Sequence, residues 1–156
     1  PIRISRIGRH RALPADFMEV PFEKYLYCDN LYQGYLQTKS EDILKELAQV
    51  LYDNEHLQPN TAQRICVFYW FASLKSFFAR KFHHFLRPVS NESANLLGST
   101  PIQQRVEESM NSQIRALTKG DITKEKQILS LDTWRALTEL DAKAQDAEEL
   151  RKLYKS

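Results

Sequence analysis

The stretch TAQRICVFYWFASLKSFFARKFHHFL, residues 61–86, is the most apolar and most aromatic part of the chain. It contains eight apolar residues in a row, from Ile65 to Ala72, which fits a buried strand or one part of a buried helix. Apolar residues then recur at steps of three and four, which is helical spacing. They are Val67, Phe71, Leu74, Phe78, Phe82 and Phe85, with Trp70 and Phe77 widening the same face. The sequence therefore predicts one central helix over residues 61–86.

Both ends of this predicted helix carry signals. Asn60 or Thr61 can cap its first turn, and Gln63 stands three residues after Asn60, as in a capping box. Its end is expected at Arg87, because the residue before a proline is pushed out of the helical region. Lys81 lies near the apolar face, so we expect its ammonium to reach outward to solvent or to meet a carboxylate. Cations interrupt the stretch too often for a membrane span.

Length and composition indicate one globular domain. The chain has 156 residues, of which 42% are hydrophobic, and this length can bury a core without a metal or a disulfide. A net charge of +2 argues against binding to polyanions through bulk charge. Cys28 and Cys66 both fall in predicted apolar helices, so we expect two reduced thiols. No signal-peptide pattern is recognisable, and we expect a cytoplasmic, reducing compartment during synthesis.

Residues 1–20 are expected to form a basic, extended N-terminal arm. No acidic residue precedes Asp16, and aliphatic side chains alternate with arginines. The arm could be a solvated terminus, could pack on a neighbouring subunit through its isoleucines, or could contact nucleic-acid phosphates through its arginines. The candidate phosphate or partner contacts are Arg3, Arg6, Arg9 and Arg11, and the candidate interface residues are Ile2, Ile4 and Ile7.

Residues 21–156 are expected to form one all-helical domain around the central helix. Residues 21–38 have a face of Tyr25, Cys28, Tyr32 and Tyr35, and a second helix follows Ser40 and runs to about Asp53. Tyr27 and Tyr35 are interface candidates, because tyrosine suits half-buried surfaces.

The second half of the chain predicts two further helices. Thr100-Pro101 begins one, which ends at Lys119-Gly120. Asp121 caps the last, a long C-terminal helix over about 122–155 that could bend near Ser130–Asp132. The apolar stripe of this helix is narrow, so its end could protrude and pair with a neighbour through Leu150, Leu153 and Tyr154.

Catalytic and metal-binding patterns are missing from the sequence. His83 and His84 are adjacent, but neighbouring residues of a helix face different directions, and no cysteine stands at metal-ligand spacing from them. Phosphate-binding glycine motifs, zinc-protease motifs and nucleophile motifs are absent as well. We therefore expect no enzyme activity, no metal, no cofactor and no small-molecule ligand.

Two segments resemble those of a protein group. NSQIRALTKGDITKEKQILSLDTWRALTELDAKA, residues 111–144, and FYWFASLKSFFARKF, residues 68–82, are similar to small helical proteins encoded in phage or prophage structural gene clusters. The two segments make up 49 of the 156 residues and carry no catalytic motif. It implies a place in the neck or tail of a virion, as in a head–tail connector, or a role in the assembly of that structure.

The sequence thus leads to an all-α, bundle-like domain with a structural function. We expect a non-enzymatic subunit or assembly factor whose partners are copies of itself and neighbouring virion proteins, with no membrane. The alternative is a nucleic-acid-associated helical module that uses the arginines of the arm.

Overall fold

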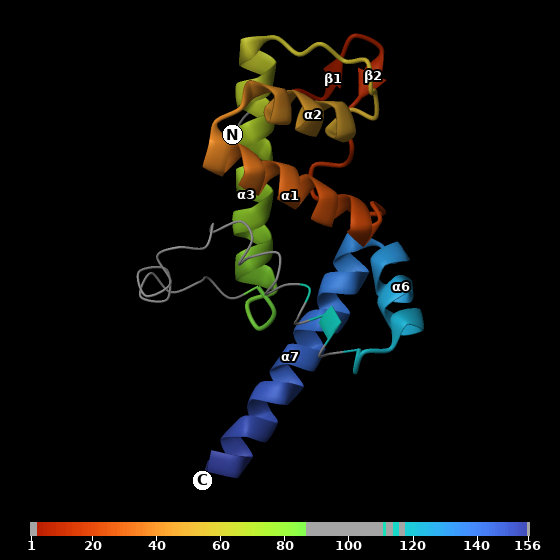
Figure 1. The fold of residues 1–156 in the computed structure, drawn as a ribbon, viewed down its shortest axis with the longest axis vertical. Coiled ribbons are helices and arrows are strands. Elements are labelled where there is room, and N and C mark those ends of the chain that lie inside the picture. Colours follow the sequence, from red (N-terminus) through yellow and green to blue (C-terminus); the bar gives the residue numbers. More distant parts are fainter. Residues whose placement is uncertain (1–2, 87–110, 112–113, 116–117, 156) are drawn as a thin grey trace.

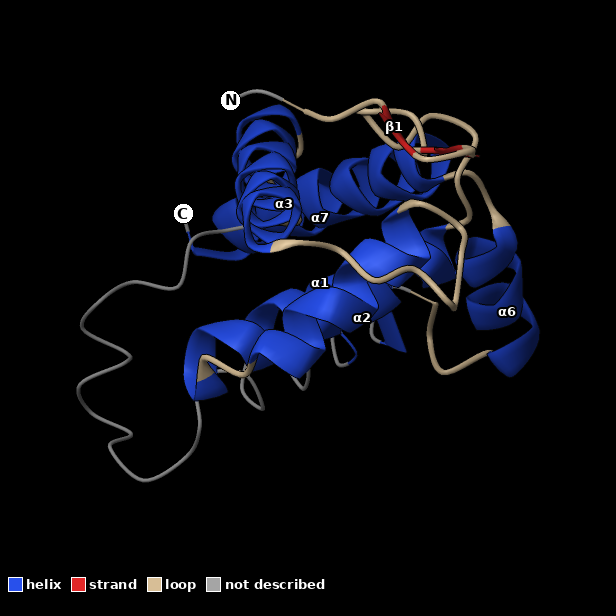
Figure 2. Ribbon diagram, turned by 90° about the horizontal axis from the view of Figure 1, so that it is seen from above, coloured by secondary structure: helices blue, strands red, loops and turns tan. Residues whose placement is uncertain are grey.

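A computed structural model describes residues 3–86, 111, 114–115 and 118–155 of the chain. These residues contain five helices: α1 (Phe22–Thr38), α2 (Glu41–Leu51), α3 (Thr61–Lys81), α6 (Ile122–Ser130) and α7 (Thr133–Lys155). They also contain one hairpin, of β1 (Arg6–Ile7) and β2 (His10–Arg11). Figure 1 shows α1 and α2 crossing α3, and Figure 2 views α3 nearly along its axis. The helix α6 and the start of α7 lie near the N-terminal end of α1. The predicted all-α class is confirmed.

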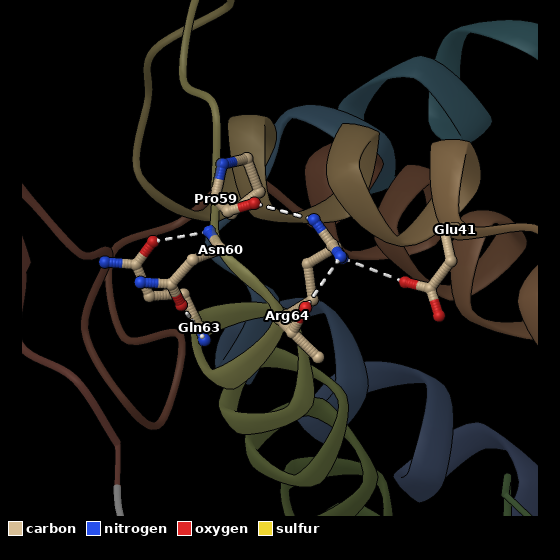
Figure 3. Close-up of polar contacts among 6 residues, drawn as sticks. Glu41, Pro59, Asn60, Gln63 and Arg64 are labelled. Carbon is tan, nitrogen blue, oxygen red and sulfur yellow. Dashed lines mark hydrogen bonds and ion pairs between the residues drawn. The ribbon is translucent and has the colours of Figure 1, made fainter.

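The first turn of α3 is held by the predicted capping box. The Asn60 side chain accepts from the Gln63 backbone N–H at 2.9 Å, and the Gln63 side chain accepts from the Asn60 N–H at 2.8 Å. Figure 3 shows both bonds and, beside them, Arg64 bridging to α2 through Glu41 at 2.9 Å. The arginine also donates to the Pro59 carbonyl at 2.7 Å. The start of α3 is therefore fixed both within the helix and against α2.

Removing this cap should cost a measurable part of the stability. We expect Asn60→Ala to lower the free energy of unfolding by about 1 kcal/mol, because a backbone N–H loses its acceptor. Ser40→Ala is the matched control, since Ser40 precedes α2 but makes no side-chain capping bond. Urea denaturation followed by circular dichroism compares the two. Equal losses for both variants would show that the Asn60 bond does not stabilise the helix.

The core forms around the aromatic face of α3. Phe71 and Phe78 are fully buried, and the Tyr25 ring of α1 lies 5.9 Å and 5.4 Å from their rings. Leu137 and Leu140 of α7 are fully buried in the same cluster. The face predicted from sequence is confirmed, because each of its six members is buried: Val67, Phe71, Leu74, Phe78, Phe82 and Phe85.

The helix α3 ends at Lys81 and not near Arg87 as predicted. A contact from α7 explains the earlier end: the Asp141 carboxylate accepts from the backbone N–H groups of His84, at 2.9 Å, and Phe85, at 3.1 Å. Those groups would otherwise continue the helical hydrogen-bond ladder. The Lys81 side chain is exposed, which agrees with the expectation that it reaches outward to solvent. Its ammonium lies 5.0 Å from the centre of the Trp134 ring.

The C-terminal region is two helices, which corrects the prediction of one long helix over 122–155. The break lies at Leu131 and Asp132, close to the predicted bend. Phe22 N–H donates to the Leu131 carbonyl at 2.8 Å, and Thr133 N–H donates to the Val20 carbonyl at 2.8 Å. These two bonds flank a strand-like bridge between Pro21 and Asp132. The backbone at the break is therefore extended, because it pairs with the segment before α1.

The end of the predicted helix over 100–119 is partly visible. Most of that helix lies outside the described residues, but Ile114 is buried and Gly120 has φ of +74°, as expected of a residue that ends a helix. Asp121 caps α6 as predicted, accepting from the Thr123 N–H at 2.9 Å.

The N-terminal segment is folded onto the body, which corrects the extended arm of the prediction. Gly8, with φ of +60°, allows a two-residue turn, and Arg6 pairs with Arg11 across it. Ala12, Phe17 and Val20 belong to the same core as the helices. The boundary placed at residue 20 therefore does not separate two packing units.

Two tryptophans hold the segment between the hairpin and α1. The Trp70 indole of α3 donates to the Ala15 carbonyl at 3.0 Å, and the Trp134 indole of α7 donates to the Asp16 carbonyl at 2.5 Å. Phe17, which follows, is fully buried although its φ is +60°. Such a backbone conformation costs an aromatic residue free energy, so the surrounding contacts must offset that cost.

Candidate functional site

The hairpin carries a cluster of exposed positive charge. Arg6 and Arg11 are direct partners across the two strands, and Arg9 lies in the turn between them. All three side chains are exposed, and none pairs with a carboxylate among the described residues. Like charges directly opposite each other on a hairpin destabilise it. An anionic partner would relieve that repulsion.

Arg3 does not belong to this cluster. Its guanidinium lies 5.1 Å from the centre of the Trp70 ring and donates to the Leu13 carbonyl at 3.3 Å. The cation is therefore used to attach the N-terminal segment to α3. Of the four arginines predicted to act together, the structure brings together Arg6, Arg9 and Arg11 and assigns Arg3 to the body.

Two isoleucines of this segment, Ile4 and Ile7, are half-buried. The Ile4 carbonyl accepts from the Tyr52 hydroxyl, and Ile7 packs in a half-buried position against the core. Ile2 lies outside the described residues. As partner contacts, Ile4 and Ile7 are therefore less available than the sequence suggested.

The two candidate tyrosines of α1 differ in their surroundings. Tyr35 is half-buried and its ring lies 5.4 Å from that of Phe68, so it is part of the packing between α1 and α3. Tyr27 is 45% exposed, and its hydroxyl donates to the Glu46 carboxylate of α2. This hydrogen bond raises the pKa of Tyr27 above its ordinary value, with smaller contributions from burial and from the negative charge of Glu46. Of the two tyrosines, Tyr27 is the more exposed to solvent.

Tyr27 lines a groove of about 820 Å³ between the first half of α1, the second half of α2 and the loop after α2. Five of its eleven lining residues are charged. Four carboxylates, those of Glu23, Glu46, Asp53 and Glu55, face one ammonium, that of Lys24. Four negative charges against one positive charge give a formal charge of −3 with His56 neutral.

The second half of α7 extends beyond the core. The buried residues of this helix end at Leu140, although the helix continues to Lys155. Figure 1 shows this half projecting away from the other helices, with the C-terminus at its tip. Three large apolar side chains on it are solvent-exposed: Leu150 by 55%, Leu153 by 72% and Tyr154 by 89%. The structure thus places all three predicted interface residues of this helix on one projecting element.

Polar groups in the interior make structural contacts between helices. The buried Asp29 carboxylate pairs with the Lys75 ammonium, and this links α1 to α3. Burial raises the pKa of Cys28 to about 12, so its thiol stays protonated and unreactive at neutral pH. Both cysteines are free, as expected. Among the residues that the structure describes, no group of histidine, cysteine and carboxylate side chains could hold a metal ion.

Sequence reasoning missed the groove. Its acidic residues come from three segments, at 23, 46 and 53–55, and each alone resembles the charged face of an ordinary helix or loop. A weak signal existed in the clustering of Asp53 and Glu55 directly after a helix, but only the packing of α1 on α2 brings Glu23 and Glu46 to the same place.

Comparison with protein-family models, with curated proteins and with solved structures finds no match to this chain. None of the helices in the described part of the chain is long and apolar enough to cross a membrane.

Proposed function

We propose that the protein is a non-enzymatic structural subunit or assembly factor of a multi-protein complex. The observation that carries the proposal is the projecting half of α7, with exposed Leu150 and Tyr154 far from the core that the same helix helps to form. Large apolar side chains that are exposed to solvent are stabilised when a partner covers them.

The remainder of the molecule supports this role. The helices α1, α2, α3 and the first half of α7 form a rigid aromatic core that fixes the direction of the projecting half. Leucine and tyrosine on one helical surface are typical of helix-in-groove recognition, in which a partner supplies an apolar groove. The resemblance of residues 68–82 and 111–144 to phage-encoded structural proteins favours a place in the neck or tail of a virion.

A site-specific photo-crosslink tests the proposal. Tyr154 is replaced with p-benzoylphenylalanine in cells that make the whole assembly, and the same residue is placed at Lys126, an exposed position of α6, as the control. We expect a discrete adduct heavier than the chain from position 154 and none from position 126. The adduct should disappear when Leu150→Glu is added, because a charge would then face the partner's apolar surface.

The nucleic-acid alternative keeps one observation in its favour, which is the cluster of Arg6, Arg9 and Arg11 on the hairpin. Guanidinium groups bind phosphate oxygens well, and such binding weakens steeply as salt rises. The loss of Arg3 from the cluster and the nearby acidic groove both count against it.

A further inference from the structure

We infer that the acidic groove between α1 and α2 receives the basic hairpin of a second copy of this chain. Two copies would exchange hairpins about a twofold axis, so that each groove is filled by the partner's hairpin. The inference deepens the proposed function and rests on it, because it names a copy of the chain as one of the partners of a structural subunit.

The groove offers the chemistry that an arginine side chain needs. Its carboxylates can accept two parallel hydrogen bonds from one guanidinium. The Tyr27 ring, 45% exposed, offers an aromatic face on which a guanidinium can stack, and Glu46 fixes its hydroxyl. Pro21 and Val50 add apolar surface for the methylene stems. The groove thus suits a segment with several arginines.

The hairpin is such a segment. It presents Arg6, Arg9 and Arg11 within six residues of chain, and these have no carboxylate partner among the described residues. The charge of +3 on the three arginines equals in size the formal charge of −3 in the groove. Because Arg6 faces Arg11 directly, insertion among carboxylates would also relieve their mutual repulsion.

Both surfaces lie at the same end of the molecule. The segment after β2 reaches the end of α2, where Leu13 N–H donates to the Leu51 carbonyl at 2.8 Å. Asp53 and Glu55 of the groove follow that helix end directly. Figure 1 shows the hairpin beside this end of α2. When two complementary surfaces are neighbours on one chain, a twofold axis can satisfy both at once, and the interface closes as a dimer.

The same geometry disfavours a nucleic acid on the hairpin. A phosphate backbone lying along the arginines would pass close to the four carboxylates of the groove, and like charges at an interface are costly. A protein segment of positive charge meets the opposite situation. The charge pattern of this end therefore selects a copy of the chain over a polyanion.

A charge-exchange experiment tests the dimer. The hairpin variant carries Arg9→Glu and Arg11→Glu, and the groove variant carries Glu46→Lys and Glu55→Lys, all at exposed positions. In a dimer of either variant alone, the hairpin and the groove that receives it would carry charges of the same sign in both contacts. We therefore expect the dissociation constant of that dimer to rise at least about tenfold. In an equimolar mixture both contacts become attractive again, so a mixed dimer should form. Sedimentation velocity measures the masses.

A matched control accounts for the change of net charge. Lys124→Glu with Lys126→Glu, on the exposed surface of α6, alters the charge as much as the hairpin variant but should leave the dimer intact. Circular dichroism of every variant confirms that the helices are retained. The wild-type dimer should also weaken as salt rises from low to high concentration.

Three results would overturn the inference. One is a wild-type protein that stays monomeric at high concentration and low salt. The second is an equimolar mixture of the two variants that remains monomeric. The third is a wild-type protein that forms no dimer but binds an oligonucleotide tightly, when the hairpin variant has lost this binding and the groove variant has kept it. If position 154 still crosslinks to a partner in these cases, the proposed function stands and only the hairpin exchange fails.

Discussion

Lys75→Met should lower the free energy of unfolding by about 3 kcal/mol, because it leaves the Asp29 carboxylate buried without its counter-ion. The ammonium also lies 5.4 Å from the centre of the Tyr32 ring, and that contact is lost as well. Since a quarter of the Lys75 side chain is exposed, we expect the low end of the range for broken buried pairs. Urea denaturation at neutral pH measures the change.

The double variant Asp29→Leu with Lys75→Met separates the cost of a lone charge from the value of the pair. Removing both charges should cost clearly less than Lys75→Met alone, since no unpaired carboxylate remains. Lys126→Met is the matched control, because Lys126 is exposed on α6 and forms no ion pair with another residue that the structure describes. This variant should change stability by less than about 0.5 kcal/mol. If Lys75→Met behaved like Lys126→Met, the pair would not contribute to the joining of α1 to α3.

Phe78→Ala should cost about 3–5 kcal/mol, the range for deleting a buried aromatic ring. Its ring lies 5.4 Å from Tyr25 of α1 and 6.1 Å from Trp134 of α7, so the ring joins three helices. A small domain has a total stability of about 5–15 kcal/mol, so this variant could unfold. Phe78→Leu keeps most of the volume and should cost less, about 1–1.5 kcal/mol, which keeps the comparison measurable.

The neighbouring residue provides the control for the ring. Phe77 is 38% exposed, although the centre of its ring lies 5.7 Å from that of Trp134. Phe77→Ala therefore removes a ring of the same size from the edge of the core. Thermal unfolding by circular dichroism compares the three variants. Equal costs for Phe77→Ala and Phe78→Ala would contradict the assignment of the central face of α3 to the core.

Local sequence signals predicted the helices well, because their causes lie within a few residues. The capping box of Asn60 and Gln63, the cap of Asp121 and the glycine at 120 each depend on neighbours in the chain. The buried face of α3 follows from side-chain spacing alone.

The departures from prediction arise from contacts between distant segments. The early end of α3 depends on Asp141, which lies more than fifty residues away along the chain. The break between α6 and α7 depends on pairing with the backbone at Val20–Phe22. The docking of the N-terminal segment depends on hydrogen bonds that the Trp70 and Trp134 indoles donate to backbone carbonyls, and the spacing of apolar residues does not indicate such bonds.

The candidate surfaces divide in the same way. The exposure of Leu150, Leu153 and Tyr154 could be predicted, because the sequence itself shows that the apolar stripe at the end of this helix is narrow. The groove could not be predicted, because its charges come from α1, from α2 and from the loop after α2. Arg3 could not be told apart from the other arginines, since only the fold shows that it stacks on Trp70.

The crosslink from position 154 tests the central claim most directly, because it asks whether the projecting half of α7 contacts another polypeptide inside the assembly. Mass spectrometry of the digested adduct identifies the attached peptide. We predict a peptide from a second subunit, either a neighbouring protein or another copy of the chain, and its loss with Leu150→Glu. Adducts that join position 154 only to its own chain, or the absence of any adduct, would contradict the proposal that this protein is a structural subunit acting through α7.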